Sequence, residues 1–167
     1  SESEQLYQQL LSSRLSVLYG ESGVGKTSLL QASVLPRLKQ AGYTVAYVRP
    51  LANPLEDVRQ ALGMTLGKGK SGSQPSTLRG FIESRLTEEQ PLLIVLDQFE
   101  TIFYSTASSI TSSGDNHELS KPSYEHFISE LVDAIQSVER EVRCVMVLRN
   151  DYLDQLDVFT KVLGYDA

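Results

Sequence analysis

Residues 20–27 read GESGVGKT, which matches the pattern G-x-x-x-x-G-K-[ST] of a phosphate-binding loop. The apolar run LSVLY at 15–19 precedes it, as expected of a buried parallel strand that enters a glycine-rich turn. After it, apolar residues recur at helical spacing to about residue 40, although Pro36 is expected to kink this helix or end it early. Strand, loop and helix stand in the order that the motif requires, so a chance match is a poor explanation.

The residue types of the loop suit the binding of an oligophosphate. Gly20 permits a tight exit from the strand, and Gly23 and Gly25 allow backbone conformations that are closed to residues with a β-carbon. Amides at the start of the following helix, with its partial positive charge, would then point at phosphate oxygens. Lys26 is predicted to bridge the β- and γ-phosphates, and the Thr27 hydroxyl to bind Mg²⁺. The predicted nucleotide-binding residues are Gly20, Glu21, Ser22, Gly23, Val24, Gly25, Lys26, Thr27 and Ser28.

Strand-like and helical segments alternate along the rest of the chain. Predicted strands are 15–19, 44–48, 92–96 and 142–148, and predicted helices are 4–13 (with Ser3 as N-cap), 27–40, 54–66, 78–86 and 124–140, with a short helix from about 151. Such alternation produces βαβ units, so we expect an α/β fold: a parallel sheet covered by helices on both faces, in a three-layer α/β/α sandwich.

Domain organisation follows from length and local composition. The 167 residues suit one domain that spans the whole chain, 1–167. Within it, residues 105–123 are rich in Ser, Thr and Asn and show no periodicity, which predicts a mobile insertion.

Charge and hydropathy exclude several classes of partner. The net charge is −6 and the Lys and Arg residues are scattered, so we expect no direct binding of nucleic acid. No apolar run approaches the roughly 18 residues that a membrane span needs, so no membrane partner is expected. The single cysteine, Cys144, cannot form an internal disulfide, and no targeting signal is recognisable; both features favour a cytoplasmic location.

A second candidate site follows the most strand-like run, LLIVL at 92–96. Asp97 comes directly after it, and a carboxylate at the end of a strand beside the phosphate loop is expected to serve the bound Mg²⁺. The alternative is that Asp97 only caps a turn. Glu100 is predicted to orient and deprotonate the attacking water, its alternative role being that of a solvated or supporting carboxylate. Gln98 stands next to Asp97, where many ATPases have a glutamate, so either Glu100 takes this role or turnover is slow.

The fourth predicted strand ends at Arg149. In one large division of P-loop proteins, the ASCE type, this strand inserts between the strand before the phosphate loop (the Walker A strand) and the strand before the acidic residue (the Walker B strand). Such an order would place Arg149 near the γ-phosphate, where it could act as a sensor. The alternative is an ordinary ion pair with Asp151 or Asp154. Arg49, after the second strand, also falls on the carboxyl edge, where open α/β sheets bind ligands. Tyr47, like Cys144, lies inside a strand and is expected to belong to the core.

Four blocks together resemble a known family. They are GESGVGKTSLLQASVLPRL (20–38), VRPLANPL (48–55), LLIVLDQFETIF (92–103) and VLRNDYLDQL (147–156). In this order they resemble the signature blocks of the STAND class of signalling ATPases, in its bacterial "novel STAND" branch. The resemblance spans most of 6–156. It implies a P-loop NTPase fold and an ATP-driven switch, ADP-bound in the off state and ATP-bound and often homo-oligomeric in the on state, inside multidomain proteins with effector and sensor modules.

The resemblance also assigns residues. It makes Lys26 and Thr27 the phosphate and Mg²⁺ residues, Asp97 the acidic Mg²⁺ residue, Glu100 the first acid of a D-x-x-E-E pattern, and Arg149 the arginine of an R-x-D-[FY] block. Thr101 departs from the family, which often has a second glutamate there, and this argues against efficient hydrolysis. The family pattern further implies that the chain is a C-terminally truncated ATPase core.

Three hypotheses for function follow. The first is a domain that binds ATP or ADP with Mg²⁺, hydrolyses ATP slowly, and switches flanking effector and sensor domains. The second is a nucleotide-binding scaffold that never hydrolyses. The third is a small-molecule kinase, which needs an arginine-rich lid and the Asp97 strand directly beside the loop strand; residues 105–123 contain no arginine. GTP is disfavoured because no N-K-x-D motif follows the fourth strand.

Overall fold

The computed structural model describes residues 1–20, 25–51, 53–67, 75–87, 89–102, 121–136 and 140–156. The strands are β1 (Leu15–Gly20), β2 (Thr44–Val48), β3 (Leu92–Leu96) and β4 (Val142–Arg149). The α-helices are α1 (Glu2–Ser12), α2 (Lys26–Leu29), α3 (Leu35–Gln40), α4 (Pro54–Leu66), α5 (Leu78–Glu83) and α7 (Lys121–Ile135). A π-helical segment (Leu30–Val34) joins α2 to α3, and a 3₁₀ helix (Asn150–Leu156) follows β4.

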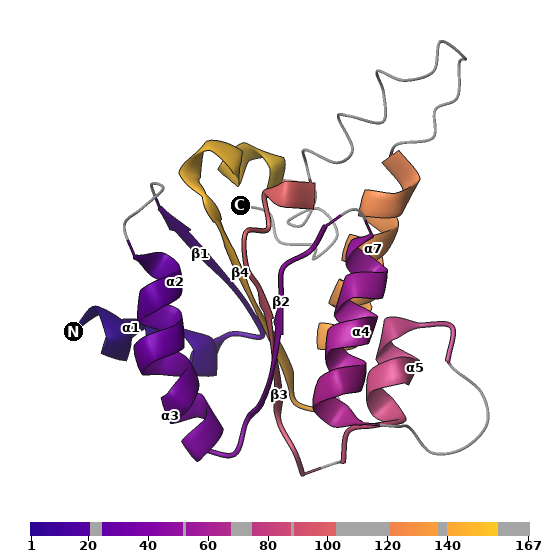
Figure 1. Ribbon diagram of the computed structural model, residues 1–167, viewed down its shortest axis with the longest axis horizontal. Helices are drawn as coiled ribbons and strands as arrows, with labels where there is room; N and C mark the ends of the chain where they lie inside the picture. The colour runs from indigo at the N-terminus through magenta and orange to yellow at the C-terminus, as the bar shows by residue number, and fades with distance from the viewer. Residues whose placement is uncertain are drawn as a thin grey trace.

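The strands form one parallel sheet in the order β1-β4-β3-β2 (Figure 1). Parallel strands cannot be joined by tight hairpins, so each connection crosses over through helical segments. The last of the described strands, β4, lies between β1 and β3, as predicted for the ASCE type of P-loop protein. All four strands therefore end at the same edge, with Gly20 opposite Arg149 at the end of β1 and β4.

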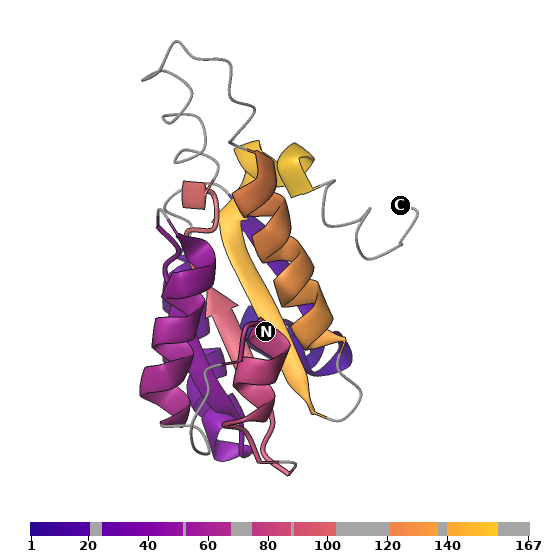
Figure 2. The same ribbon diagram turned by 90° about the vertical axis from the view of Figure 1, so that its right-hand side faces the viewer.

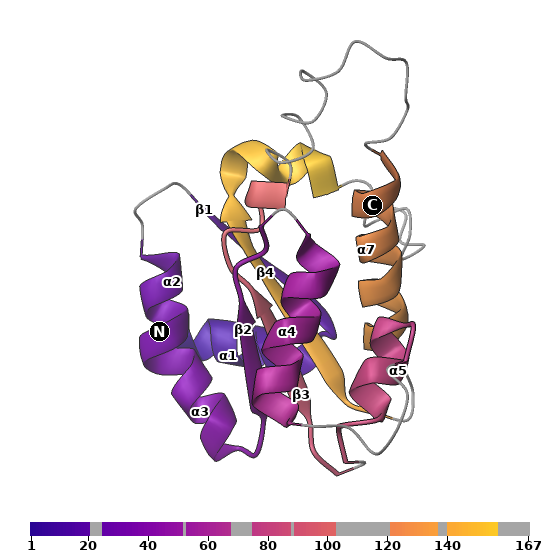
Figure 3. The ribbon, with the colours of Figure 1, turned by 45° about the vertical axis from the view of Figure 1, so that its right-hand side comes forward.

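Helices cover both faces of this sheet, as predicted (Figures 1 and 3). Alternate residues of each strand point to opposite faces. The strand residues on one face, which include Val95 and Val147, pack with α1, α2, the π segment and α3. Those on the other face, which include Ile94 and the buried Cys144, pack with α4, α5 and α7. Figure 2 shows α7 and α5 along the second face. Cys144 therefore belongs to the core, as expected.

Helices α1 and α7 begin earlier than predicted, and α5 ends earlier, at Glu83. Helix α1 begins earlier, with Ser1 as its N-cap and not Ser3, because the Ser1 hydroxyl accepts a hydrogen bond from the amide of Glu4. Helix α7 begins at Lys121, inside the stretch expected to be a mobile insertion, since Pro122 is well suited to a first helical turn. Residues 105–120 of that stretch lie outside the described residues. Among the described helices, none is long and apolar enough to cross a membrane.

The helix after the glycine-rich segment runs past Pro36, contrary to the expectation that it could end there. Residues 30–34 wind as a π-helix, and the amide of Leu35 donates to the carbonyl of Leu30, five residues back. A proline has no amide hydrogen, and its ring clashes with a carbonyl one α-helical turn earlier. The wider turns before Pro36 accommodate both features, so the helical path continues to Gln40.

Candidate functional site

The glycine-rich segment joins β1 to α2 at the carboxyl edge of the sheet. Gly25, just before α2, has φ +79°, a left-handed conformation that favours glycine. An added Cβ there would meet nothing within 4 Å, so backbone conformation and not space requires the glycine. The Gly25 carbonyl accepts from the amide of Leu29 at 2.9 Å and so begins the helix. Four of the other predicted loop residues lie outside the described residues: Glu21, Ser22, Gly23 and Val24. Lys26 is described by its backbone, as the first residue of α2. Ser28 is exposed on the same helix.

The predicted metal residues, Thr27 and Asp97, are in direct contact. Asp97 is 1% exposed, and its backbone amide donates to the carbonyl of Val48 at 2.9 Å, which fixes it beside the end of β2. The Thr27 hydroxyl donates to Asp97 Oδ1 at 3.2 Å. The backbone amide of Gln98 donates to the same oxygen at 2.9 Å. The structure thus joins the start of α2 to the end of β3 through one carboxylate.

The second oxygen of Asp97 faces β2. The Tyr47 hydroxyl donates a hydrogen bond to Oδ2, and Arg49 Nε lies 3.5 Å from the same atom. Burial, and then the hydrogen bond to Asp97, raises the pKa of Tyr47 to about 12. Tyr47 was expected to belong to the core, and its partly buried ring does pack against the hydrophobic cluster under α2, the π segment and α3. Its hydroxyl in addition reaches Asp97, a contact that the sequence pattern did not predict.

Strand alternation explains why these side chains meet. Tyr47 pairs with Val95 across β2 and β3, and both residues belong to the face covered by α2, the π segment and α3. Asp97 follows Val95 by two positions, so its side chain points to the same face. The register of β2 against β3, which no local pattern in the sequence specifies, therefore places the aromatic hydroxyl and the acid on the side of the glycine-rich segment.

A strained turn follows Asp97. Gln98 is exposed and has φ 51°, which is unusual for a residue other than glycine and costs roughly 1 kcal/mol. The next residue, Phe99, is buried, donates its amide to the carbonyl of Val147 at 2.9 Å and stacks at a tilt on Phe127, so the turn is anchored to β4 and α7. Glu100 follows this anchor and is half-buried. Its Oε2 has no hydrogen-bond partner among the described residues.

Arg149 is the last residue of β4 and lies at the same edge of the sheet. Its backbone is opposite Gly20, the first residue of the glycine-rich segment. Its guanidinium Nη2 donates to Asp151 Oδ2 at 2.8 Å, and both side chains are partly exposed. The structure therefore contains the ion pair considered as the alternative for Arg149. Its role as a phosphate sensor stays a prediction.

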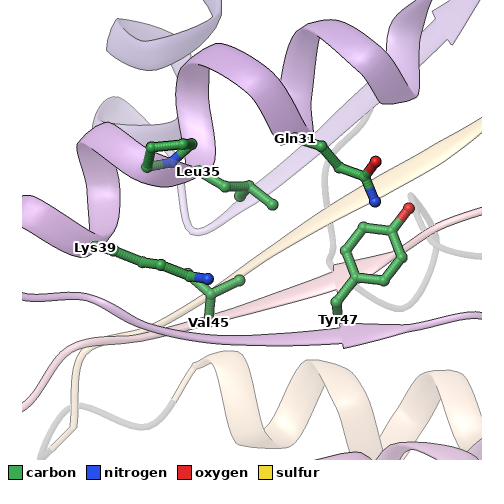
Figure 4. Close-up of a pocket in the computed structure, with 6 residues that line it drawn as sticks. Gln31, Leu35, Lys39, Val45 and Tyr47 are labelled. Carbon is green, nitrogen blue, oxygen red and sulfur yellow. The ribbon is translucent and has the colours of Figure 1, made fainter.

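A pocket of about 280 Å³ adjoins the site. It lies between the helix that follows the glycine-rich segment and β2, and Gln31, Leu35, Pro36, Lys39, Val45 and Tyr47 line it. Figure 4 shows the amide of Gln31 and the hydroxyl of Tyr47 pointing toward each other. One side of Tyr47 therefore borders this pocket, while its hydroxyl reaches Asp97.

The donor atoms decide what kind of metal the site could accept. Among the described residues, no group of three or more His, Cys, Asp or Glu side chains could hold a metal ion. Thr27 and Asp97 instead offer a hydroxyl and a carboxylate, which are hard oxygen ligands. Mg²⁺ accepts one or two such protein ligands when phosphates and waters complete its shell, so the pair fits Mg²⁺ delivered with a nucleotide.

Together, this sheet order, a helix that starts after a left-handed glycine, and a buried aspartate beyond the inserted strand define the P-loop NTPase fold. The family model "Novel STAND NTPase 1" matches residues 1–164, and the chain belongs to this family. The chain is thus an NTPase-like nucleotide-binding domain, which confirms the resemblance seen in its sequence. A comparison with curated proteins finds no match.

Proposed function

We propose that this domain binds ATP and ADP with Mg²⁺, hydrolyses ATP slowly, and serves as the nucleotide switch of a larger signal-transduction protein. The observation that carries the proposal is the contact of Thr27 with the buried carboxylate of Asp97 at 3.2 Å. It joins the segment expected to hold phosphates to the acid expected to serve the metal. Family membership supports the nucleotide-binding part of the proposal.

The direction of the Thr27 hydrogen bond suits a metal ligand. The Thr27 hydroxyl donates its hydrogen to Asp97, so the lone pairs of its oxygen point away from the carboxylate and could accept a metal ion. Mg²⁺ bound with the nucleotide would supply charge neutralisation at the β- and γ-phosphates. In this arrangement Thr27 holds the ion, Asp97 orients Thr27, and Lys26 with the amides from Gly23 to Ser28 binds the phosphates.

Slow hydrolysis follows from the acids available after β3. Glu100 is the first carboxylate after Asp97, and its buried Oε2, which has no hydrogen-bond partner among the described residues, would accept a hydrogen bond from the attacking water. Thr101 cannot share this work as a second acid, because it has no carboxylate and its hydroxyl donates to the Gln98 carbonyl at 2.8 Å. A domain with one such acid favours a long-lived ATP state, which suits a switch. Arg149, opposite Gly20, would leave Asp151 to contact the γ-phosphate.

The alternatives differ in what they require. A small-molecule kinase needs the Asp97 strand directly beside the loop strand, and the insertion of β4 between β1 and β3 argues against it. A scaffold that never hydrolyses requires only binding, and the exposed Gln98 beside Asp97 favours it over a rapid ATPase. Single-turnover measurements separate the two: with protein in excess over radiolabelled Mg·ATP, a switch converts the label to ADP over minutes to hours, whereas a scaffold leaves ATP intact.

The binding proposal is tested by Lys26→Ala. Loss of the lysine that is expected to bridge the β- and γ-phosphates should weaken Mg·ATP binding by about a hundredfold in isothermal titration calorimetry. Lys39→Ala is the matched control, since Lys39 is an exposed lysine near the end of the same helical path, in α3. Equal affinities for Lys26→Ala and the wild type would overturn the proposed site.

A further inference from the structure

The two oxygens of Asp97 have different partners. Oδ1 accepts from the Thr27 hydroxyl and the Gln98 amide, both of which belong to the proposed nucleotide site. Oδ2 accepts from the Tyr47 hydroxyl and lies 3.5 Å from Arg49 Nε, and both of these residues come from the β2 side. The rotation of the Asp97 carboxylate about its Cβ–Cγ bond therefore depends on the groups that contact Oδ2.

Of the two groups at Oδ2, Tyr47 is the more firmly fixed. The Arg49 side chain is 57% exposed, and its 3.5 Å separation makes a weak, solvent-screened interaction. The Tyr47 ring packs against the hydrophobic cluster under α2, the π segment and α3, and its backbone is held in β2 opposite Val95. An aromatic side chain anchored in this way has little freedom, so its hydroxyl sets a fixed position for Oδ2.

We propose that Tyr47 is a positioning residue of the nucleotide site: its hydroxyl fixes the Asp97 carboxylate so that Oδ1 stays on Thr27, the expected Mg²⁺ ligand. This inference rests on the proposed function and adds a specific role in its metal dependence. Without the hydroxyl, Asp97 can rotate toward Arg49 and solvent, and Thr27 loses its orienting acceptor. Groups that orient a metal ligand commonly change metal affinity or activity about tenfold or more when removed.

The protonation state of Tyr47 is consistent with this role. Burial and the neighbouring Asp97 raise its pKa to about 12, so the phenol keeps its proton at neutral pH. It therefore remains a hydrogen-bond donor to Asp97 at neutral pH.

The test is Tyr47→Phe, which removes the hydroxyl and keeps the ring. ATP affinity is measured by calorimetry with Mg²⁺ and again with EDTA, and the ratio of the two affinities is the readout. We expect affinity in EDTA to stay within about twofold of the wild type, while the gain on adding Mg²⁺ falls about tenfold. A purely structural role for Tyr47 would lower both affinities together or neither.

Tyr43→Phe is the matched control. Tyr43 directly precedes β2, packs on the same cluster and also donates to a carboxylate, Glu141, but at the opposite edge of the sheet. It should leave the Mg²⁺-dependent gain unchanged. If the wild type shows no Mg²⁺-dependent nucleotide binding, the proposed function itself fails. If the wild type shows that gain and Tyr47→Phe retains all of it, only the role of Tyr47 is overturned.

A double-mutant cycle keeps the test decisive even if Tyr47→Phe lowers stability. Because Tyr47 is proposed to act through Asp97, adding Tyr47→Phe to Asp97→Asn should change the Mg²⁺-dependent gain by less than about twofold. Additive losses of that gain in the double variant would show that Tyr47 acts independently of Asp97, and would contradict the inference.

Discussion

The two edges of the sheet contain similar sets of groups in opposite arrangements. At the amino edge, Tyr43 donates to Glu141 at 2.6 Å, and Arg143 Nε donates to both. At the carboxyl edge, Tyr47 donates to Asp97, and Arg49 lies beside the same carboxylate. Each cluster thus combines a tyrosine from the β2 region, an acid and an arginine.

The difference lies in which charge is buried. Arg143 is 19% exposed, whereas its partner Glu141 is 49% exposed; Asp97 is 1% exposed, whereas Arg49 is 57% exposed. At the amino edge a mostly buried cation is surrounded by acceptors, so the cluster is complete. Among the described side chains, the buried anion at the carboxyl edge is paired only with the peripheral Arg49, and a buried charge requires compensation. The carboxyl edge therefore suits the proposed binding of a cation from outside, whereas at the amino edge the largely buried cation is already paired with Glu141.

The largest effect is expected from breaking the amino-edge cluster with Arg143→Met, which keeps much of the apolar stem. Arg143 Nη1 donates to the carbonyls of Ser13 and Leu10, at 2.9 and 3.4 Å, and so ties the end of α1 to the sheet. Loss of these charged hydrogen bonds should lower the free energy of unfolding by about 2 to 3 kcal/mol, measured by urea denaturation. The Mg²⁺-dependent gain in ATP affinity should not change. A selective loss of that gain would show that the amino edge is not purely structural.

The fold was largely predictable because its signals are local. The runs TVAYV and LLIVL gave β2 and β3 with the observed bounds, since a buried parallel strand needs continuous apolar residues and Pro50 and Asp97 interrupt them. The order of β4 between β1 and β3 came from the family pattern and not from local propensity. Pro36 left a kink and an early end of the helix both open, because the sequence does not show that the preceding turn widens into the π-helical segment that accommodates the proline.

The candidate site was predictable only in part. Thr27 and Asp97 were selected for one site because a glycine-rich motif and an acid after a strand are strong signals; the structure brings them into contact, and their metal role stays a prediction. Tyr47 was missed because an aromatic residue inside a strand most often belongs to the core, and only the register of β2 against β3 shows that it faces Asp97. That register is a long-range property, and no motif in the chain specifies it.

A smaller effect on stability, which depends on pH, is expected at Glu141 and would sharpen the contrast between the two edges of the sheet. The hydrogen bond from Tyr43, and then that from Arg143, holds the pKa of Glu141 below its ordinary value of 4.5, although burial opposes this. A carboxyl group with a lowered pKa in the folded state stabilises the protein above its unfolded-state pKa, and this stabilisation disappears as pH falls through the folded-state value. Glu141→Gln should therefore cost up to about 1 kcal/mol at pH 7, a figure reduced by the exposure of the side chain.

Urea denaturation between pH 7 and pH 3 would check this expectation. The difference between the wild type and Glu141→Gln should narrow toward zero as the pH falls. When Tyr43→Phe is also present, the stability difference caused by Glu141→Gln should be smaller at pH 7, because the donor that most lowers the Glu141 pKa is gone. A difference that is constant over this pH range would contradict the assigned cause.

The smallest effect on stability is expected from Arg49→Gln, the counterpart of Arg143→Met at the carboxyl edge. Because Arg49 is exposed and 3.5 Å from Asp97, its removal should change the free energy of unfolding by less than about 1 kcal/mol. It should also leave the buried carboxylate less compensated in the absence of metal, so the Mg²⁺-dependent gain in ATP affinity should rise slightly, by about twofold. Denaturation and calorimetry on this variant measure both quantities. A stability loss as large as that of Arg143→Met would mean that the two arginines are equivalent, and the buried anion at the carboxyl edge would then already have its cation.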